Sequence, residues 1–287
     1  MAEHWDSFRA MNTEIDAIVV SDFAPSDAFL NVRLLFERQE ERFSRFRETS
    51  LLSRLNRGEE VDDETFARCC RMAIEAHELT SGLFNPMVLP ALRAAGYDRS
   101  FEEVRGGELE RQAVPDPRDA IAIDGNRLRL HEGQLDLGGI VKGWTVDLAV
   151  EALSERYPDI FLNAGGDLRC EGREENQPDG WLVSVAGLAG QEDAWQGVMT
   201  GSLATSTSLK RRWQTASGEE AHHLIDPRTG LPGNSPFVQV SAWEDETWRA
   251  EVWAKAILIG GEATAKRAAE FGVEVFAITR DGNAFEW

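Results

Sequence analysis

Residues 135–144 read LDLGGIVKGW, and they join a Gly-Gly turn to a helix that we predict over residues 139–155. Glycines before a helix let the backbone approach a ligand closely, and the free N–H groups of the first turn suit anionic oxygens. Lys142 adds a cation in that turn, and Asp136 precedes it as a hydrogen-bond acceptor. The same residues also fit a plain glycine loop with a capping carboxylate, because neither GxxxxGK[ST] nor GxGxxG is present.

Strands and helices surround this segment without a regular β-α-β alternation. Strands outnumber what such an alternation would give, so the pattern predicts an α+β fold with antiparallel sheets and packed helices. No repeat or linker divides the chain. The helices are expected over residues 26–46 (capped by Ser26), 50–56, 63–80, 247–259 and 262–270, and the strands over residues 15–21, 120–123, 127–130, 160–164, 168–171, 181–186, 197–204, 221–225, 238–243 and 273–279.

Composition narrows the class of protein. The chain has 287 residues, of which 42% are hydrophobic, and a net charge of −20. An acidic body repels phosphate backbones and anionic membranes, which argues against nucleic-acid binding. No run of about 18 apolar residues and no apolar leader segment is visible, so membrane insertion is not expected. Cys69, Cys70 and Cys170 lack metal-ligand spacing, and reduced thiols in a cytoplasmic protein are the expectation.

Two further segments carry polar side chains in turns. NAGGD, residues 163–167, lies between two predicted strands and fits a tight turn. AHHLIDPRTGLP, residues 221–232, runs from a strand into an Asp-Pro turn. Adjacent histidines on a strand point to opposite faces, which argues against a shared zinc ion. One of them could serve as a base, and a purely structural histidine fits equally well.

Three other segments have ordinary explanations when taken alone. ATSTS, residues 204–208, offers hydroxyl groups and is typical of a solvated loop. Glu251 and Lys255 stand four residues apart, as in many surface ion pairs on helices. FSRFR, residues 43–47, places aromatic rings and arginines at a helix end, where they suit either a nucleotide ring or helix packing.

Taken together and in this order, these segments resemble the ApbE family, the FAD:protein FMN transferases. The resemblance runs from Met11 to about Gly261. It implies one α+β domain over residues 1–287, related to the T-fold, with FAD in a cleft between two lobes. It rests on FSRFRETSLLSRLN (43–56), TSGLFNPMVLPALRAAGYD (80–98), LDLGGIVKGW (135–144), NAGGD (163–167), LATSTSLKRRW (203–213), HHLIDPRTGLP (222–232) and AEVWAKA (250–256).

The resemblance also implies roles for single residues. Met11 would lie near the adenine, Phe46 beside the flavin nucleotide, and His223 would take part in the transfer. Asn85 stands where the family usually has Asp. The positions implied to bind FAD are Met11, Phe46, Leu83, Phe84, Asn85, Asp136, Lys142 and the Ile225 backbone, and the catalytic ones are His223 and Glu251.

The implied metal site departs from the family pattern. The family motif Asp-Ala-x-Ala/Ser-Thr places Mg²⁺ on the Asp and the Thr, together with the carbonyl at the position of Gly139. Here the positions are Gly139, Glu251 and Ala254, with Lys255 in place of the Thr. Glu is able to ligate Mg²⁺, whereas a protonated Lys is not. Either Mg²⁺ binds with fewer protein ligands, or the Lys255 ammonium replaces it.

The implied reaction cleaves the FAD pyrophosphate, attaches FMN through a phosphoester to a Ser or Thr of an acceptor flavoprotein, and releases AMP. Acceptors of the family present a short Ser/Thr-containing motif. Two alternatives stay open at this point. The chain could bind or deliver flavin without catalysis because its metal site is altered, or it could hydrolyse FAD to FMN and AMP.

Overall fold

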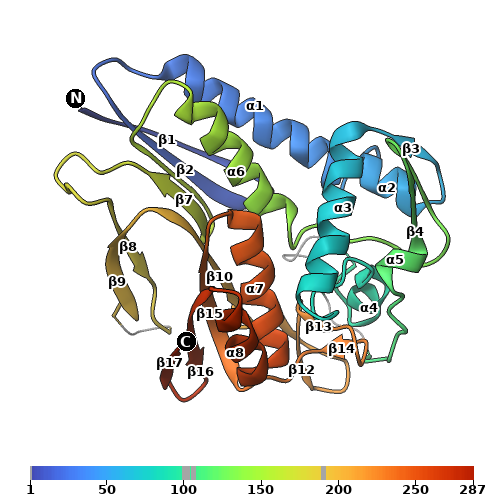
Figure 1. The fold of residues 1–287 in the computed structure, drawn as a ribbon. Coiled ribbons are helices and arrows are strands. Elements are labelled where there is room, and N and C mark those ends of the chain that lie inside the picture. Colours follow the sequence, from blue (N-terminus) through green and yellow to red (C-terminus); the bar gives the residue numbers. More distant parts are fainter. Residues whose placement is uncertain (1, 99–103, 105–107, 189–191) are drawn as a thin grey trace.

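The computed structural model describes residues 2–98, 104, 108–188 and 192–287. An antiparallel sheet of eight strands forms its centre, in the order β1-β2-β6-β7-β10-β15-β16-β17 (Figure 1). All neighbours in this sheet run antiparallel. The strands are β1 (Ala2–Ala10), β2 (Thr13–Ser21), β6 (Ile160–Ala164), β7 (Asp167–Glu171), β10 (Gly201–Thr207), β15 (Phe237–Glu244), β16 (Glu274–Thr279) and β17 (Ala284–Glu286).

Side chains leave both faces of this sheet to be covered. In β2, Ile15, Ala17 and Val19 pack with helices on one face, whereas Ile18 and Val20 belong to a separate apolar cluster on the other. Because neighbouring residues of a strand point to opposite faces, a nearly unbroken apolar run such as this one needs a cover on each side. The hairpin of β8 (Trp181–Val185) and β9 (Trp195–Met199) contributes Trp181, Val183 and Val185 to the second cluster.

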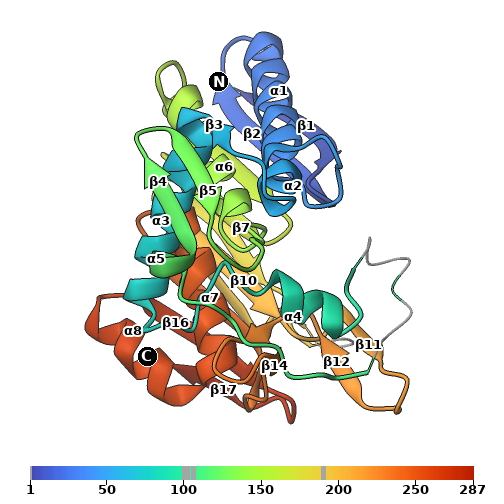
Figure 2. The same cartoon turned by 90° about the vertical axis from the view of Figure 1, so that its right-hand side faces the viewer.

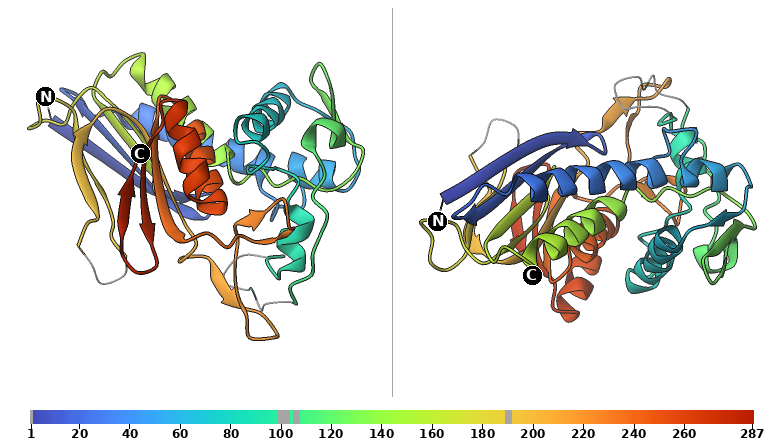
Figure 3. Two further views of the ribbon diagram at one scale, coloured as in Figure 1. Left: turned by 60° about the horizontal axis from the view of Figure 1, so that its bottom comes forward. Right: turned by 90° about the horizontal axis from the view of Figure 1, so that it is seen from above.

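Helices cover the first face. Helix α6 (Val141–Ser154) packs on β6 and β7, and helix α7 (Thr247–Gly260) packs on β10 and β15. Figure 3 shows the long N-terminal helix running beside the first of these. Besides α6 and α7, which lie on the centre of the sheet, this face is covered by α1 (Ser26–Phe43) and α8 (Glu262–Glu270).

A second group of elements lies beside the sheet and is built around α3 (Figure 2). Its core contains Phe66, Cys69, Cys70 and Leu137, and it extends to Trp144 of α6. Both cysteines are fully buried and free, and burial raises the pKa of Cys70 to about 12, so they act as apolar side chains. The group comprises α2 (Leu51–Asn56), α3 (Glu64–Leu79), α4 (Leu89–Ala94), α5 (Pro117–Ala120), β3 (Val61–Asp62), β4 (Ile121–Asp124) and β5 (Arg127–Leu130). Two small hairpins complete the fold: β11 (Arg212–Gln214) with β12 (Glu220–His222), and β13 (Ile225–Asp226) with β14 (Leu231–Pro232).

The α+β prediction is confirmed, and several element limits differ from expectation. The strand expected over 197–204 is two strands, β9 and β10, and residues 204–207 lie in the centre of the sheet instead of a solvated loop. Ser26 does not cap α1, because the N-cap is Pro25 and makes no side-chain bond. The edge strands β1 and β17 were not predicted. Their mixed polar composition is typical of sheet edges, which carry little apolar periodicity.

No helix among the described residues is long and apolar enough to cross a lipid bilayer.

Candidate active site

Two buried helix ends hold the centre of the site together. The backbone N–H of Gly143, at the start of α6, donates to Oε2 of Glu251 at 3.0 Å. In return Asp147 of α6 accepts from the N–H groups of Thr247 and Trp248, at 2.9 and 3.1 Å, at the start of α7. Each helix therefore supplies the carboxylate that satisfies free N–H groups at the N-terminus of the other, where the helix dipole also favours negative charge.

Gly143 is required for this crossing. A methyl group on its Cα would lie 2.8 Å from the carbonyl oxygen of Thr247 and 2.9 Å from Cα of Trp248, both backbone atoms. Only glycine therefore lets the two helices approach closely enough for Glu251 to reach the start of α6. Gly143, the last glycine of LDLGGIVKGW, is thus needed for the contact between the helices, whether or not a ligand binds there.

Lys255 turns inward at this crossing. Its Nζ lies 2.8 Å from Oε1 of Glu251, and Glu251 is fully buried. The expectation of an ordinary surface ion pair for these residues is therefore wrong. The Lys255 methylenes pass beside Gly139, where a methyl group would lie 3.3 Å from Cδ and 3.1 Å from the Phe84 ring. Burial opposes ionisation of Glu251, but Lys255 and Lys142 outweigh it and lower the pKa of this carboxyl.

A second buried ion pair adjoins the first. The Lys142 ammonium contacts the Asp167 carboxylate and donates to the carbonyl oxygen of Ala164 at 2.8 Å. Burial, reinforced by the charge of Glu251, raises the pKa of Asp167 to about 6, against the opposing effect of Lys142 and Lys255. The cluster therefore places two buried carboxyl groups against two lysine side chains.

The turn that carries Asp167 lies against the turn between β1 and β2. Gly165 has φ +62°, and a methyl group on it would overlap the Thr13 hydroxyl. Met11 occupies the β1–β2 turn with φ 49°, and its N–H donates to Glu40 at 3.0 Å. Its side chain packs against both the α3 core and the α1–α6 core. Met11 thus lies where the two groups of elements meet.

Asp136 is held by an arginine that lies between two rings. Nε of Arg45 is 3.1 Å from its Oδ2, while Oδ1 accepts from the N–H of Gly138 at 2.8 Å. The Arg45 guanidinium lies 4.5 Å from the centre of the Phe46 ring and 4.4 Å from that of Tyr97. Such cation–π contacts fix its position. Phe46 stays 43% exposed, which leaves a ring available to a ligand.

Residues 83–85 follow α3 in the chain, and the side chains of Leu83 and Asn85 contact other parts of the protein. The Asn85 amide donates to the carbonyl oxygen of Pro115 at 3.0 Å and accepts from the N–H of Met87 at 2.8 Å. Leu83 packs in the α7–α8 core. The side-chain amide of Asn85 therefore ties the loop to the backbone of Pro115 and Met87, and these bonds hold it in one orientation.

His223 follows the β11–β12 hairpin. Its Nδ1 is buried and has no hydrogen-bond partner among the described residues. Burial lowers the pKa of His223 well below its usual value, and Arg211, His222 and Lys255 lower it further. The imidazole is therefore neutral at pH 7, and the same burial makes it a weaker base than an exposed histidine. Ile225 is buried beside Tyr97 and Leu92, so only its backbone is available to a ligand.

The structure brings most of the predicted positions together and adds three more. A contact group is formed by Phe84, Gly139, Glu251 and Lys255. Lys142 adjoins this group through Asp167, and Asp136 forms its ion pair with Arg45 beside Phe46. Ala254 is fully buried next to this group. Sequence reasoning did not select Arg45, Tyr97 and Asp167, although all three lie inside the quoted segments FSRFR, AAGYD and NAGGD.

The donor set around Gly139 does not fit a divalent ion. Mg²⁺ prefers six oxygen ligands in octahedral geometry. Both oxygens of Glu251 already accept hydrogen bonds, from Lys255 and from Gly143. The described residues contain no group of three or more His, Cys, Asp or Glu side chains placed to hold a metal. The positions assigned to the metal by resemblance therefore hold an ammonium group beside a carboxylate.

Solved structures share this architecture. The ApbE protein of Thermotoga maritima superposes with a TM-score of 0.89 at 22% identity, over 99% of this chain and 96% of that chain. The flavin transferase ApbE from Vibrio cholerae gives a TM-score of 0.82 at 21% identity, over 100% of this chain and 96% of that chain. The fold is thus that of the flavin transferase structures.

Residues 11–277 match the model of the ApbE family, and the chain belongs to this family. It is similar to the FAD:protein FMN transferase of Vibrio cholerae serotype O1, with 26% identity over 88% of this chain and 79% of that protein. It is also similar to the FAD:protein FMN transferase of Treponema pallidum, with 27% identity over 88% of this chain and 77% of that protein.

Proposed function

We propose that this protein is an FAD:protein FMN transferase in which the Lys255 ammonium takes the place of the metal ion. Membership of the ApbE family supports the reaction class. The observation that carries the second part is the position of Lys255, against Gly139 and paired with the buried Glu251. FAD lies between the sheet and the α3 group, contacted by Met11, Phe46, Phe84 and Asp136.

In this reaction a Ser or Thr hydroxyl of the acceptor attacks the phosphorus on the FMN side of the FAD pyrophosphate. One P–O bond forms to the acceptor, the bond to the bridging oxygen breaks, and AMP leaves with that oxygen. Negative charge develops on the phosphoryl oxygens, and nearby cations stabilise it. Lys255 has three donors, and Glu251 takes one of them. The others are directed at the pyrophosphate.

His223 acts as the base for the hydroxyl proton. It is neutral at pH 7 for the reasons given above, and its Nδ1 has no partner among the described residues. Asp136 orients the flavin nucleotide while Arg45 holds its carboxylate in place. One ammonium offers a single positive charge where Mg²⁺ offers two, so the reaction is expected to be slower than with a metal.

The test is an incubation of the protein with FAD and a peptide carrying the Ser/Thr motif of an acceptor, in EDTA and in Mg²⁺. Mass spectrometry measures the peptide–FMN adduct and free AMP. The expected result is equal transfer in both buffers. Lys255→Thr, which recreates the Thr of the family motif and frees one Glu251 oxygen, should lose transfer in EDTA and regain it in Mg²⁺.

Lys266→Thr is the matched control, because Lys266 makes the same i,i+4 ion pair with Glu262 on the exposed surface of α8 at 2.7 Å. It should leave transfer unchanged. Transfer by the unmodified protein that requires Mg²⁺ would refute the ammonium proposal. FAD binding without any AMP would favour a flavin-delivery protein, and AMP with free FMN would favour hydrolysis.

A further inference from the structure

A separate hollow of about 320 Å³, open to solvent, lies on the sheet face opposite α7 and α8. Trp195 and Trp243 belong to the apolar cluster of this second face, while the Val275 side chain packs with α7 and α8. The sheet thus separates the hollow from Glu251 and Lys255. Its lining comprises Trp195, Trp243, Glu274, Val275, Phe276, Glu286 and Trp287.

Strand register explains why rings and carboxylates alternate here. Trp243 pairs with Glu274 across β15 and β16, and Phe276 pairs with Glu286 across β16 and β17. Paired residues share a face, and residues two apart on one strand do as well. Trp243, Glu274, Phe276 and Glu286 therefore form one block of two rings and two carboxylates.

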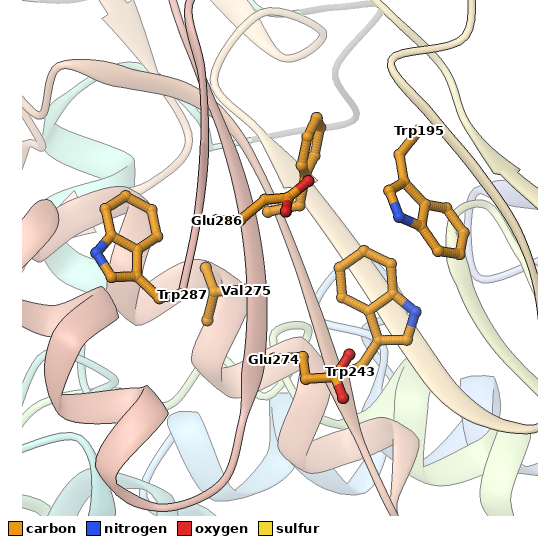
Figure 4. Close-up of a pocket in the computed structure, with 7 residues that line it drawn as sticks. Trp195, Trp243, Glu274, Val275, Glu286 and Trp287 are labelled. Atoms are coloured by element: carbon orange, nitrogen blue, oxygen red, sulfur yellow. The ribbon is translucent and has the colours of Figure 1, made fainter.

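Trp195 of β9 adds a wall to this block. Its ring lies 4.9 Å from that of Trp243, centre to centre, with 63° between their planes. Figure 4 shows both indoles on the same side of the strands as Glu286, with the Trp287 indole on the other side. Trp287 packs against Phe237 at 5.7 Å, so it supplies backbone to the hollow and no ring face.

The charge of the hollow is negative. Glu274 and Glu286 are exposed, and neither makes an ion pair with any residue that the structure describes. The chain as a whole carries a net charge of −20. An anionic ligand would therefore be repelled, and a neutral aromatic ligand would leave both carboxylates without a role. A divalent metal ion would be held by carboxylate oxygens and waters, so the indole rings would have no role in binding it.

We propose that this hollow binds a small alkylated ammonium ion of the choline type. The negative faces of aromatic rings attract quaternary ammonium groups, whose methyl groups also lose little hydration on burial against indole. The two carboxylates balance the charge at the rim. A volume of about 320 Å³ lies within the range of pockets that hold small molecules.

Choline is the probe, and its neutral isostere 3,3-dimethylbutan-1-ol is the control, because the two share shape and differ in charge. Titration of the full chain, followed by the proton NMR shift of the methyl groups, gives both affinities. Choline should bind saturably with an upfield ring-current shift, and the alcohol should bind at least about twofold more weakly, since it lacks the charge that the ring faces attract.

Variants assign the binding to this hollow. The double variant Glu274→Gln with Glu286→Gln, both exposed side chains whose loss leaves the core intact, should weaken choline by about threefold or more and leave the alcohol unchanged. Trp243→Leu should reduce the upfield shift, because it removes one of the rings that line the hollow. Glu270→Gln, an exposed glutamate on α8 across the sheet, should change nothing. Equal affinity for choline and the alcohol, no saturable binding of choline, or unchanged binding by the double variant would each overturn the proposal.

Discussion

The substitution Gly143→Ala tests how closely α6 and α7 cross. Taken as a helix position alone, Gly143 should be improved by alanine by about 0.8–1.0 kcal/mol. The tertiary contacts predict the opposite. The new methyl group would lie 2.8 Å from the Thr247 oxygen and 2.9 Å from Cα of Trp248, and neither backbone atom is able to move without displacing α7.

The magnitude follows from two costs and one gain. Overpacking a well-packed interior costs about 1–3 kcal/mol. Displacing α7 also lengthens the 3.0 Å bond from Gly143 to the buried Glu251 carboxylate, and an unsatisfied buried group costs about 1–3 kcal/mol. After the propensity gain is subtracted, the free energy of unfolding should fall by about 3 kcal/mol, and by at least about 1 kcal/mol.

Urea denaturation followed by circular dichroism measures this change. Gly233→Ala is the matched control, because its methyl group would meet only ordinary contacts, the nearest at 3.6 Å. That variant should be neutral or slightly stabilising. A Gly143→Ala protein as stable as the parent chain would show that the helix crossing is not tight and that Glu251 does not need a glycine at position 143 to reach the start of α6.

Three further predictions concern single side chains. Asp147→Asn should lower the free energy of unfolding by about 1–3 kcal/mol, because it weakens the acceptor for two N–H groups of α7. Asp124→Asn, at the exposed end of β4, should leave it unchanged, and equal melting temperatures of the two variants would contradict this. Asp167 binds its proton more tightly in the folded chain, with a pKa of about 6 against an ordinary 3.8, so its stabilising contribution is complete below about pH 4 and is lost as the pH rises through 6. Relative to Asp167→Asn, the free energy of unfolding of the parent chain should therefore fall by up to about 3 kcal/mol across this interval. Parallel pH profiles of the two proteins would refute the assignment. Arg45→Met should weaken FAD binding about tenfold in fluorescence titrations, because Asp136 loses its charged partner, while Arg129→Met, an exposed arginine of β5, serves as the control that must keep full affinity.

Local sequence patterns predict many of the helices and strands. The apolar spacing of residues 247–270 predicts α7 and α8 nearly to their limits, and Ser50 and Asp63 were expected at helix starts, where they now accept from Ser53 and Phe66. These signals are local, because a helix face and a capping side chain involve residues within one turn of each other. The order of the quoted segments also sufficed to identify the family.

Long-range contacts decided the rest. The sequence places Glu251 and Lys255 one turn apart, a spacing that fits a surface ion pair as well as a buried one, and only the packing of α7 on α6 buries the carboxylate and turns the ammonium toward Gly139. Arg45, Tyr97 and Asp167 are far apart in the chain, so no local pattern marks them as partners of the site. Trp243 and Glu274 likewise become neighbours through strand register alone. Periodicity determines which elements form, whereas the charge environment of a site depends on groups that only the folded chain brings within a few ångströms.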